Sequence, residues 1–279
     1  MRTASIWSAG LPLLLIACGG VESSSGPSAD VGGDPAFDAA ITTIACGATL
    51  LEDLRLEEDL ICAGDGIIVG ADGIKINLNG HSITGPGIGN GILVRDLHDI
   101  TIFGGTVQGF QAGIMVATSA GVVIKDNHFT QNREAVFLAG ASGNVVKANV
   151  MWQNRLRGIM IRPSGSGALS TDNDIKDNIL TDNASGILVF GQPGNSFKSN
   201  TITGSRTAAL DLLVGASGNE FKDNLLASSA VAIRFSTGWS GNVFKDNTIQ
   251  QNTCGTQGPG TANTFIGNTF TGNVTDICP

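Results

Sequence analysis

The chain has 279 residues, of which 42% are hydrophobic and 14% are charged, and its formal net charge is −8 at pH 7. The negative charge lies in the first third, because residues 1–98 hold 12 acidic residues against 4 Lys and Arg, whereas residues 99–279 hold 12 of each. A neutral body has no electrostatic attraction for phosphate backbones, so the composition gives no support to nucleic-acid binding.

Residues 1–17 have the pattern of a signal peptide. Arg2 provides a basic start, and the apolar run from Leu11 to Leu15 is too short to span a bilayer. The following tetrapeptide, Leu15-Ile16-Ala17-Cys18, resembles the lipobox of bacterial lipoproteins, in which the cysteine is lipidated and becomes the new N-terminus. The resemblance implies lipidation of Cys18 and a protein anchored to the membrane rather than spanning it.

The expected location follows from this segment. Gly19, directly after the cysteine, resembles the sorting signal for the outer membrane. We therefore expect an exported protein held at the bacterial outer membrane or cell surface by a lipid anchor. Ordinary secretion with an unmodified Cys18 is the alternative, and it would leave the protein periplasmic or secreted.

The remaining chain divides into a tether and one domain. Residues 18–40 begin with the lipidated cysteine and are mostly Gly, Ser, Pro, Ala and Asp, which predicts a flexible tether. Residues 41–279 have the length of a single domain. Its start, at about 44–65, includes the acidic stretch 51–59, which we expect to cap the first repeat and block edge pairing.

Four cysteines follow Cys18, and an even number in an exported protein indicates disulfides. Of the three possible connectivities, we favour Cys46–Cys62 and Cys254–Cys278, which place one pair near each end of the domain. Metal ligation is the competing explanation, but no CxxC motif or histidine-rich cluster accompanies these cysteines.

A repeated phrase, an apolar residue followed by Lys and ending in Asn, predicts the fold. Its six copies begin at residues 124, 146, 175, 197, 221 and 244, and successive lysines are 22, 29, 22, 24 and 23 residues apart. Each period contains three short alternating stretches separated by Gly, Asn and Ser, which are too short for an α-solenoid and lack a leucine-rich framework. The sequence therefore predicts an all-β, right-handed parallel β-helix with three short strands per coil of about 22 residues.

Equal offsets should become vertical neighbours, because adjacent coils of a β-helix lie about 4.8 Å apart. Three apolar columns should then form the core. They are Ile124, Val146, Ile175, Phe197, Phe221, Phe244 and Phe265; Val107, Phe129, Met151, Leu180, Ile202, Leu226, Ile249 and Phe270; and Ile92, Ile114, Val136, Ile159, Ile187, Leu210 and Ile233. Two asparagine columns should lie at bends, where asparagine tolerates left-handed conformations. They are Asn127, Asn149, Asn178, Asn200, Asn224, Asn247 and Asn268, and Asn132, Asn154, Asn183 and Asn252.

The repeat resembles a known superfamily. The block from Asn178 to Val189 resembles the repeat of NosD-like proteins with the pectate-lyase fold, and the segments 66–73 and 77–83 resemble the first coil of such proteins. The resemblance covers residues 44–279 and implies the fold. Its members include pectate and alginate lyases, mannuronan epimerases, galacturonases and a periplasmic protein linked to copper-enzyme assembly, so it does not select an activity.

The catalytic signatures of these relatives are missing. The chain has no tyrosine, no Asp-Pro-His-Glu motif like that of mannuronan epimerases, and neither the Gly-His-Gly nor the Arg-Ile-Lys signature of galacturonases. No compact aspartate cluster indicates calcium-assisted elimination. The three histidines, His81, His98 and His128, sit at different offsets, so we expect no metal site and no cofactor.

An arginine-rich surface is the main candidate for ligand binding. Arg133, Arg155 and Arg206 share one offset at a bend, and an exposed Trp and an insertion after Arg162 lie in the same coils. Guanidinium groups bind carboxylates in a forked geometry, so this surface could hold an anionic sugar. The alternative is that these are solvated bend residues. The candidate residues are Arg133, Glu134, Trp152, Arg155, Arg157, Arg162, Asp182 and Arg206.

Two further columns should face outward. Six lysines, from Lys125 to Lys245, form a basic stripe that we interpret mainly as a soluble face. A second stripe is apolar, which indicates either cover by the chain itself or contact with a protein partner. Its members are Leu93, Met115, Phe137, Met160 and Leu188.

These observations favour a non-catalytic β-helix of the cell envelope that binds glycan, such as an anionic polysaccharide, or another envelope component. A polysaccharide lyase or uronate epimerase that uses the arginine surface is the first alternative. A protein-docking scaffold that uses the apolar stripe is the second.

Overall fold

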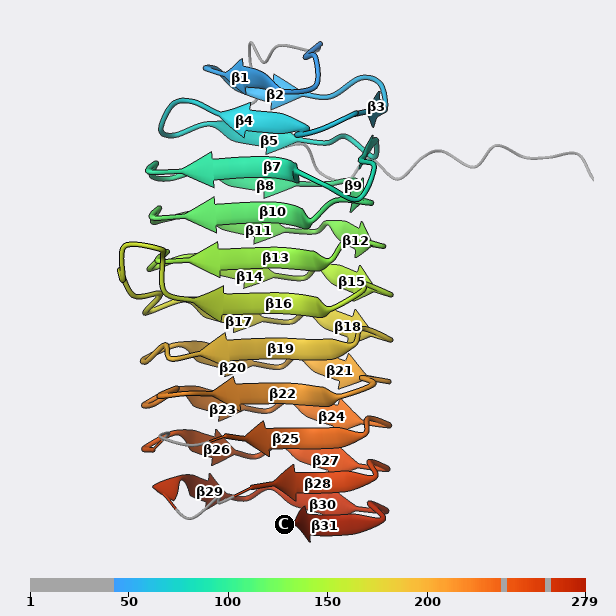
Figure 1. Ribbon diagram of the computed structural model, residues 1–279, viewed down its shortest axis with the longest axis vertical. Helices are drawn as coiled ribbons and strands as arrows, with labels where there is room; N and C mark the ends of the chain where they lie inside the picture. The colour runs from blue at the N-terminus through green and yellow to red at the C-terminus, as the bar shows by residue number, and fades with distance from the viewer. Residues whose placement is uncertain (1–42, 237–239, 259–261) are drawn as a thin grey trace, which may run out of the picture. The chain divides into compact units, whose positions relative to one another are not determined.

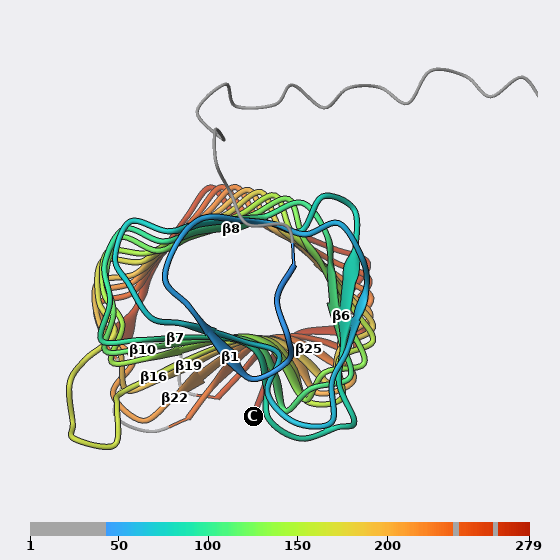
Figure 2. The same ribbon diagram turned by 90° about the horizontal axis from the view of Figure 1, so that it is seen from above.

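The computed structural model describes residues 43–236, 240–258 and 262–279, and it consists of parallel strands without an α-helix in these ranges. The predicted signal peptide, the lipidation site at Cys18 and the tether up to residue 40 lie outside the described residues. Successive strands belong in turn to three sheets, so that each coil contributes one strand to each sheet (Figures 1 and 2). No helix in the described ranges is long and apolar enough to cross a membrane.

The three sheets run the length of the coil stack. Sheet I has 11 strands: β1 (Ala48–Leu50), β4 (Ile67–Val69), β7 (Asn90–Arg95), β10 (Ala112–Ala117), β13 (Glu134–Ala139), β16 (Arg157–Arg162), β19 (Ser185–Phe190), β22 (Ala208–Leu213), β25 (Val231–Phe235), β28 (Cys254–Gln257) and β31 (Thr275–Cys278). Sheet II has 10: β2 (Leu54–Arg55), β5 (Lys75–Asn77), β8 (Thr101–Phe103), β11 (Val123–Lys125), β14 (Val145–Lys147), β17 (Asp174–Lys176), β20 (Ser196–Lys198), β23 (Glu220–Lys222), β26 (Val243–Lys245) and β29 (Thr264–Ile266). Sheet III has 10: β3 (Leu60–Ile61), β6 (Ser82–Thr84), β9 (Thr106–Gln108), β12 (His128–Thr130), β15 (Val150–Trp152), β18 (Ile179–Thr181), β21 (Thr201–Thr203), β24 (Leu225–Ala227), β27 (Thr248–Gln250) and β30 (Thr269–Thr271).

The predicted register is confirmed. Phe197 pairs with Phe221 and Phe221 with Phe244 in sheet II, and the rings stack with centroid distances of 4.5 and 4.7 Å. The neighbouring lysines pair in the same order and form the outward stripe. Strands of two to six residues alternate between inward and outward side chains, so one offset places every copy on the same side of the coil.

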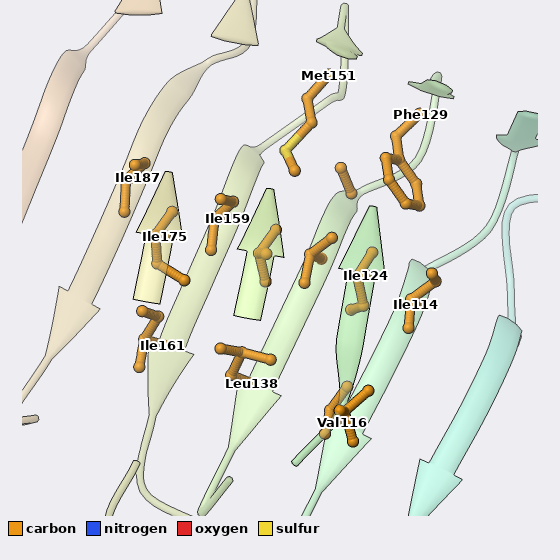
Figure 3. Close-up of a cluster of buried hydrophobic side chains, with 14 of the residues drawn as sticks. Ile114, Val116, Ile124, Phe129, Leu138, Met151, Ile159, Ile161, Ile175 and Ile187 are labelled. Atoms are coloured by element: carbon orange, nitrogen blue, oxygen red, sulfur yellow. The ribbon is translucent and has the colours of Figure 1, made fainter. Parts of the chain in front are cut away.

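The core is a narrow apolar column inside the coils. Figure 3 shows Ile114, Ile159 and Ile187 in one row, with Phe129 and Met151 side by side in another. All five are at most 1% exposed. Each coil alone could not bury such side chains, so stacking on neighbouring coils is what removes them from water.

The bends have a common construction that the sequence analysis assigned differently. The left-handed residue is not the ladder asparagine but the residue before it, for example Asp126 with φ 55° before Asn127 and Gln153 with φ 53° before Asn154. The asparagine that follows is buried. Asn154 Oδ1, for example, accepts from both nitrogens of Asn132 in the preceding coil, and the nitrogens of Asn154 donate to Asn183 in the next. Its side chain therefore replaces backbone partners that the bend would leave unpaired.

A third asparagine ladder, at the bend between sheets I and II, was not predicted. Asn173 illustrates it: its Nδ2 donates to Asn195 Oδ1 at 2.9 Å, and its own Oδ1 accepts from Asn144 Nδ2 at 2.9 Å. The ladder continues from coil to coil towards the C-terminus. Its members are Asn144, Asn173, Asn195, Asn219, Asn242 and Asn263.

The N-terminal segment forms the first coil itself rather than lying across it. The strands β1, β2 and β3 pair in register with β4, β5 and β6, because Leu50, Leu54 and Leu60 continue the inward columns. Both expected disulfides are present. The Cα atoms of Cys46 and Cys62 are 5.5 Å apart, and those of Cys254 and Cys278 are 6.1 Å apart, so one bridge lies in the first coil and one ties the last two coils together.

Candidate functional site

The bend between sheets III and I carries three exposed arginines in one column, as predicted. Arg155 Nε donates to the carbonyl oxygen of Gln131 at 3.3 Å, and Arg206 Nη1 donates to that of Asp182 at 3.1 Å. Arg133 is also exposed here. Neither Arg155 nor Arg206 forms an ion pair within the described ranges, so each guanidinium keeps donors available to a ligand.

A pocket of about 470 Å³ lies beside Arg155. Gln131 and Gln153, both in left-handed bend positions, line it together with the turn Gly85–Gly87. A Cβ atom on Gly87, whose φ is +98°, would lie 3.3 Å from Arg155 Nη2. The absence of a side chain at Gly87 therefore leaves the guanidinium room to line the pocket.

Trp152 stands on the outer face of sheet III, directly before Gln153. It is 46% exposed, although it is the last residue of β15. Its neighbours in the register are Thr130 and Thr181, which are much smaller. The indole therefore rises above the surrounding surface and offers a flat apolar face beside the polar groups of the bend.

We call Gln131, Trp152, Gln153 and Arg155 the bend site. It combines an aromatic face, two amides and a guanidinium on adjacent coils. Asp182 follows Gln153 in the same bend column, with φ 55°, and adds one exposed carboxylate next to Arg206.

Glu134 and Arg157 lie at the start of β13 and β16 in sheet I, next to the bend arginine Arg133. Arg157 Nη1 is 3.0 Å from Glu134 Oε1, and Arg133 Nε is 3.6 Å from the same oxygen. The Glu134 side chain is only 6% exposed. Burial raises the pKa of its carboxyl group, and this effect outweighs the opposite influence of Arg133 and Arg157.

Arg162 does not join the bend cluster, contrary to the grouping expected from sequence. It ends β16, a strand of six residues whose first residue, Arg157, lies next to the bend. Six extended residues place the two ends of the strand on the order of 16 Å apart. The guanidinium of Arg162 lies over the Phe137 ring, 4.9 Å from its centroid, towards the C-terminal end of the sheet I strands.

The sequence assigns the chain to a protein family, and the coil architecture agrees with this assignment. A family model described as a right handed beta helix region matches residues 65–226, more than half of the chain. The chain belongs to this right-handed β-helix family. The predicted fold and handedness are thus confirmed. None of the curated proteins is detectably similar in sequence.

Solved structures share the β-helix over most of this chain. The A-module of a mannuronan C-5 epimerase from Azotobacter vinelandii superposes with a TM-score of 0.66 and 17% identity, covering 81% of this chain and 70% of that module. A surface protein and adhesin of Streptococcus pneumoniae gives a TM-score of 0.60 and 11% identity, covering 82% and 87%. A mutant tailspike of E. coli bacteriophage HK620, in complex with a pentasaccharide, gives 0.67 and 9%, covering 86% and 55%. At these identities the likeness establishes the fold alone.

The apolar stripe on sheet I of this β-helix is largely covered by its own neighbours. Leu188 is 3% exposed, and Leu93, Met115, Phe137 and Met160 are half-buried. The column ends in a forked ion pair between Asp211 and Arg234. The role of the stripe in docking a protein stays a prediction.

Metal ligation has no support from the described coils, where no three His, Cys, Asp or Glu side chains gather as a metal site would require. His128 is exposed on sheet III. His81, in the second coil, has its Nδ1 3.4 Å from Asp59 Oδ1 in the first coil. The histidines are therefore dispersed over the stack.

The sequence analysis missed the turn Gly85–Gly87 as part of the bend site. The signal was present, because Gly85, Gly109, Gln131 and Gln153 share one offset in the repeat. A glycine in that offset carries no side chain to suggest chemistry, and its contribution is the space it leaves.

The buried Glu134 predicts a pH effect on stability. The folded chain holds the Glu134 proton more tightly than the unfolded chain, so stability from this group is present below pH 4.5, the ordinary pKa, and is lost as pH rises through the folded pKa. Urea unfolding across this range should show the loss in the native chain and not in Glu134→Gln. The same change at Glu220, whose side chain is 43% exposed, is the control. A parallel pH dependence in the native and Glu134→Gln chains would contradict the prediction.

Proposed function

We propose that this protein binds an extended anionic polysaccharide at the bend site and does not transform it. The observation that carries the proposal is the half-exposed Trp152, whose chain neighbour Gln153 lines a pocket together with Gln131 and Arg155. Sugar rings pack their apolar faces on aromatic side chains, while amides and guanidinium groups bind hydroxyl and carboxylate oxygens.

The arginine column extends the surface along the coil axis. From Arg133 to Arg206 the column covers four coils, which corresponds to about 14 Å. A ligand that uses the whole column must therefore be elongated, and it must carry negative charge. The solved relatives point in the same direction, since one is a mannuronan C-5 epimerase and another is in complex with a pentasaccharide.

The proposal places the protein in the cell envelope. Two disulfides require an oxidising compartment, and the periplasmic, surface and tailspike proteins among the structural relatives are compatible with export. The lipid anchor expected at Cys18 is part of the proposal, because it would hold a binding protein at the membrane where envelope polysaccharides occur.

A binding experiment tests the bend site. We expect titration of the full chain with alginate and with polygalacturonate to give saturable binding to at least one, and binding should weaken as salt rises. Trp152→Ala and Arg155→Gln should each weaken it about tenfold, equivalent to about 1.4 kcal/mol. Phe190→Ala, which removes another exposed aromatic ring, is the matched control and should leave the affinity unchanged.

Two outcomes would contradict the proposal. The first is binding that survives both substitutions at the bend site without change. The second is formation of unsaturated uronate products, detected by ultraviolet absorbance, or inversion of uronate stereochemistry, either of which would make the protein an enzyme.

A further inference from the structure

A second pocket, of about 490 Å³, lies at the C-terminal ends of the sheet I strands, whereas the bend site lies near their N-terminal ends. It is bounded by β7, β10 and β13 and by the segment 163–169, which protrudes after β16 (Figures 1 and 2). Its volume is within the range of small-ligand sites, roughly 300–1,000 Å³. We call it the loop pocket.

The floor of the loop pocket is a single column of the register. Arg95 pairs with Ala117, Ala117 with Ala139, and Ala139 with Arg162. The two alanines leave the floor low, and an arginine stands at either end of a stretch of about 14 Å. Both arginines are exposed and line the same pocket, and within the described ranges neither forms an ion pair.

Contact with Phe137 holds Arg162 in position. Its guanidinium lies over the Phe137 ring at 4.9 Å, which favours one orientation of the side chain while leaving its outer edge free. A guanidinium that is already oriented loses less conformational entropy when it binds a carboxylate.

The outer wall is a structured turn rather than a bare insertion. Ser164 N donates to the carbonyl oxygen of Ala168 at 2.8 Å, Ala168 N donates to Ser164 Oγ at 3.0 Å, and the Oγ atoms of Ser164 and Ser166 are 2.8 Å apart. On the opposite wall, the Thr118 hydroxyl donates to Asp96. Serine and threonine residues therefore line the pocket, and the Asp96 carboxylate, which also lines it, accepts from Thr118.

We propose that the loop pocket binds a short sugar acid, with carboxylates held by Arg95 and Arg162. The hydroxyls of the two walls suit the hydroxyls of the ligand, and Met115 and the floor alanines suit the apolar face of a sugar ring. This site is separate from the bend site, because the six residues of β16 lie between them. Binding at the loop pocket therefore does not depend on whether the bend site binds a polymer.

Calorimetric titration with trigalacturonate tests the loop pocket. The full chain should carry Trp152→Ala together with Arg155→Gln, so that the bend site contributes little to the signal. We expect saturable binding at millimolar or lower concentration, and at least tenfold weaker binding to Arg162→Gln and to Arg95→Gln in that background. Ala139→Leu should weaken binding similarly, because it fills the floor while keeping both charges. Arg55→Gln, the same change at a distant exposed arginine, should have no effect.

The methyl ester of the same trisaccharide provides the chemical control. Its loss of charge should reduce affinity at least tenfold. The proposal is overturned by absence of binding, by binding of the ester equal to that of the acid, or by affinity that Arg162→Gln and Arg95→Gln leave unchanged. Thermal unfolding of each variant verifies that it is folded.

Discussion

Phe221→Ala is expected to lower the free energy of unfolding by about 3–5 kcal/mol. The ring is fully buried in the middle of the sheet II stack, with Phe197 on one side at 4.5 Å and Phe244 on the other at 4.7 Å. Alanine would lose the buried area of the ring and leave a cavity between two coils. The coils cannot close this cavity, because their backbones are fixed by the ladder hydrogen bonds of three sheets.

Urea unfolding of the native chain and the variant would measure this loss, read from the midpoint at constant slope. Phe265→Ala is the matched control, because Phe265 belongs to the same stack but is 37% exposed in the last coil. Its cost should be clearly smaller. Equal losses at the two positions would mean that the stack does not stabilise the fold through burial.

The coil stack could be predicted from sequence because the repeat fixes the register. The longest interval, 29 residues, separates Lys147 from Lys176, and yet these two lysines pair directly. The extra residues leave the coil as the segment 163–169 and return to it without shifting the strands. An insertion at a bend costs the stack nothing, whereas a one-residue shift inside a strand would turn its core side chains outward.

The construction of the bends could be predicted only in part. The third ladder has a visible signal, an asparagine two positions before each inward residue of sheet II from Val146 onward, such as Asn219 before Phe221. The left-handed residue before the ladder asparagine, in contrast, varies among Asp, Gln, Ser, Ala and Gly, and Ala148 adopts φ 54° with no intrinsic preference for it. The neighbouring coils impose this conformation, so residue type alone does not reveal it.

The candidate site could be predicted residue by residue but not as a group. The shared offset correctly placed Arg155 and Arg206 in one column, and Trp152 is exposed as expected. Arg162 was grouped with them because it is close in sequence. The length of β16 separates them, and strand length in sheet I does not follow from the repeat of sheet II.

Asn200→Ala is expected to lower the free energy of unfolding by about 2–4 kcal/mol, because a buried group left without its partner costs about 1–3 kcal/mol. Asn200 is 1% exposed, and its Nδ2 donates to the carbonyl oxygen of Ile175 at 2.9 Å and to Asn224 Oδ1 at 3.0 Å. Its Oδ1 accepts from both the backbone and the side-chain nitrogen of Asn178. Alanine would therefore leave the nitrogens of Asn178 and the carbonyl oxygen of Ile175 without this partner, whereas Asn224 Oδ1 would keep the backbone nitrogen of residue 200 as its donor.

Asn200→Asp separates the hydrogen bonds that the side chain accepts from those that it donates. A carboxylate can still accept from Asn178, but it cannot donate to Ile175 or to Asn224 Oδ1, and it would bring a buried charge next to that oxygen. Asn200→Asp should therefore be at least as destabilising as Asn200→Ala at neutral pH, and less so in acid, where the protonated form regains one donor. Lys198→Ala, two residues away on the exposed face, should change stability by less than about 0.5 kcal/mol in the same urea unfolding experiment. If Asn200→Ala were equally mild, the ladder would be a consequence of the coil stack and not one of the interactions that hold it together.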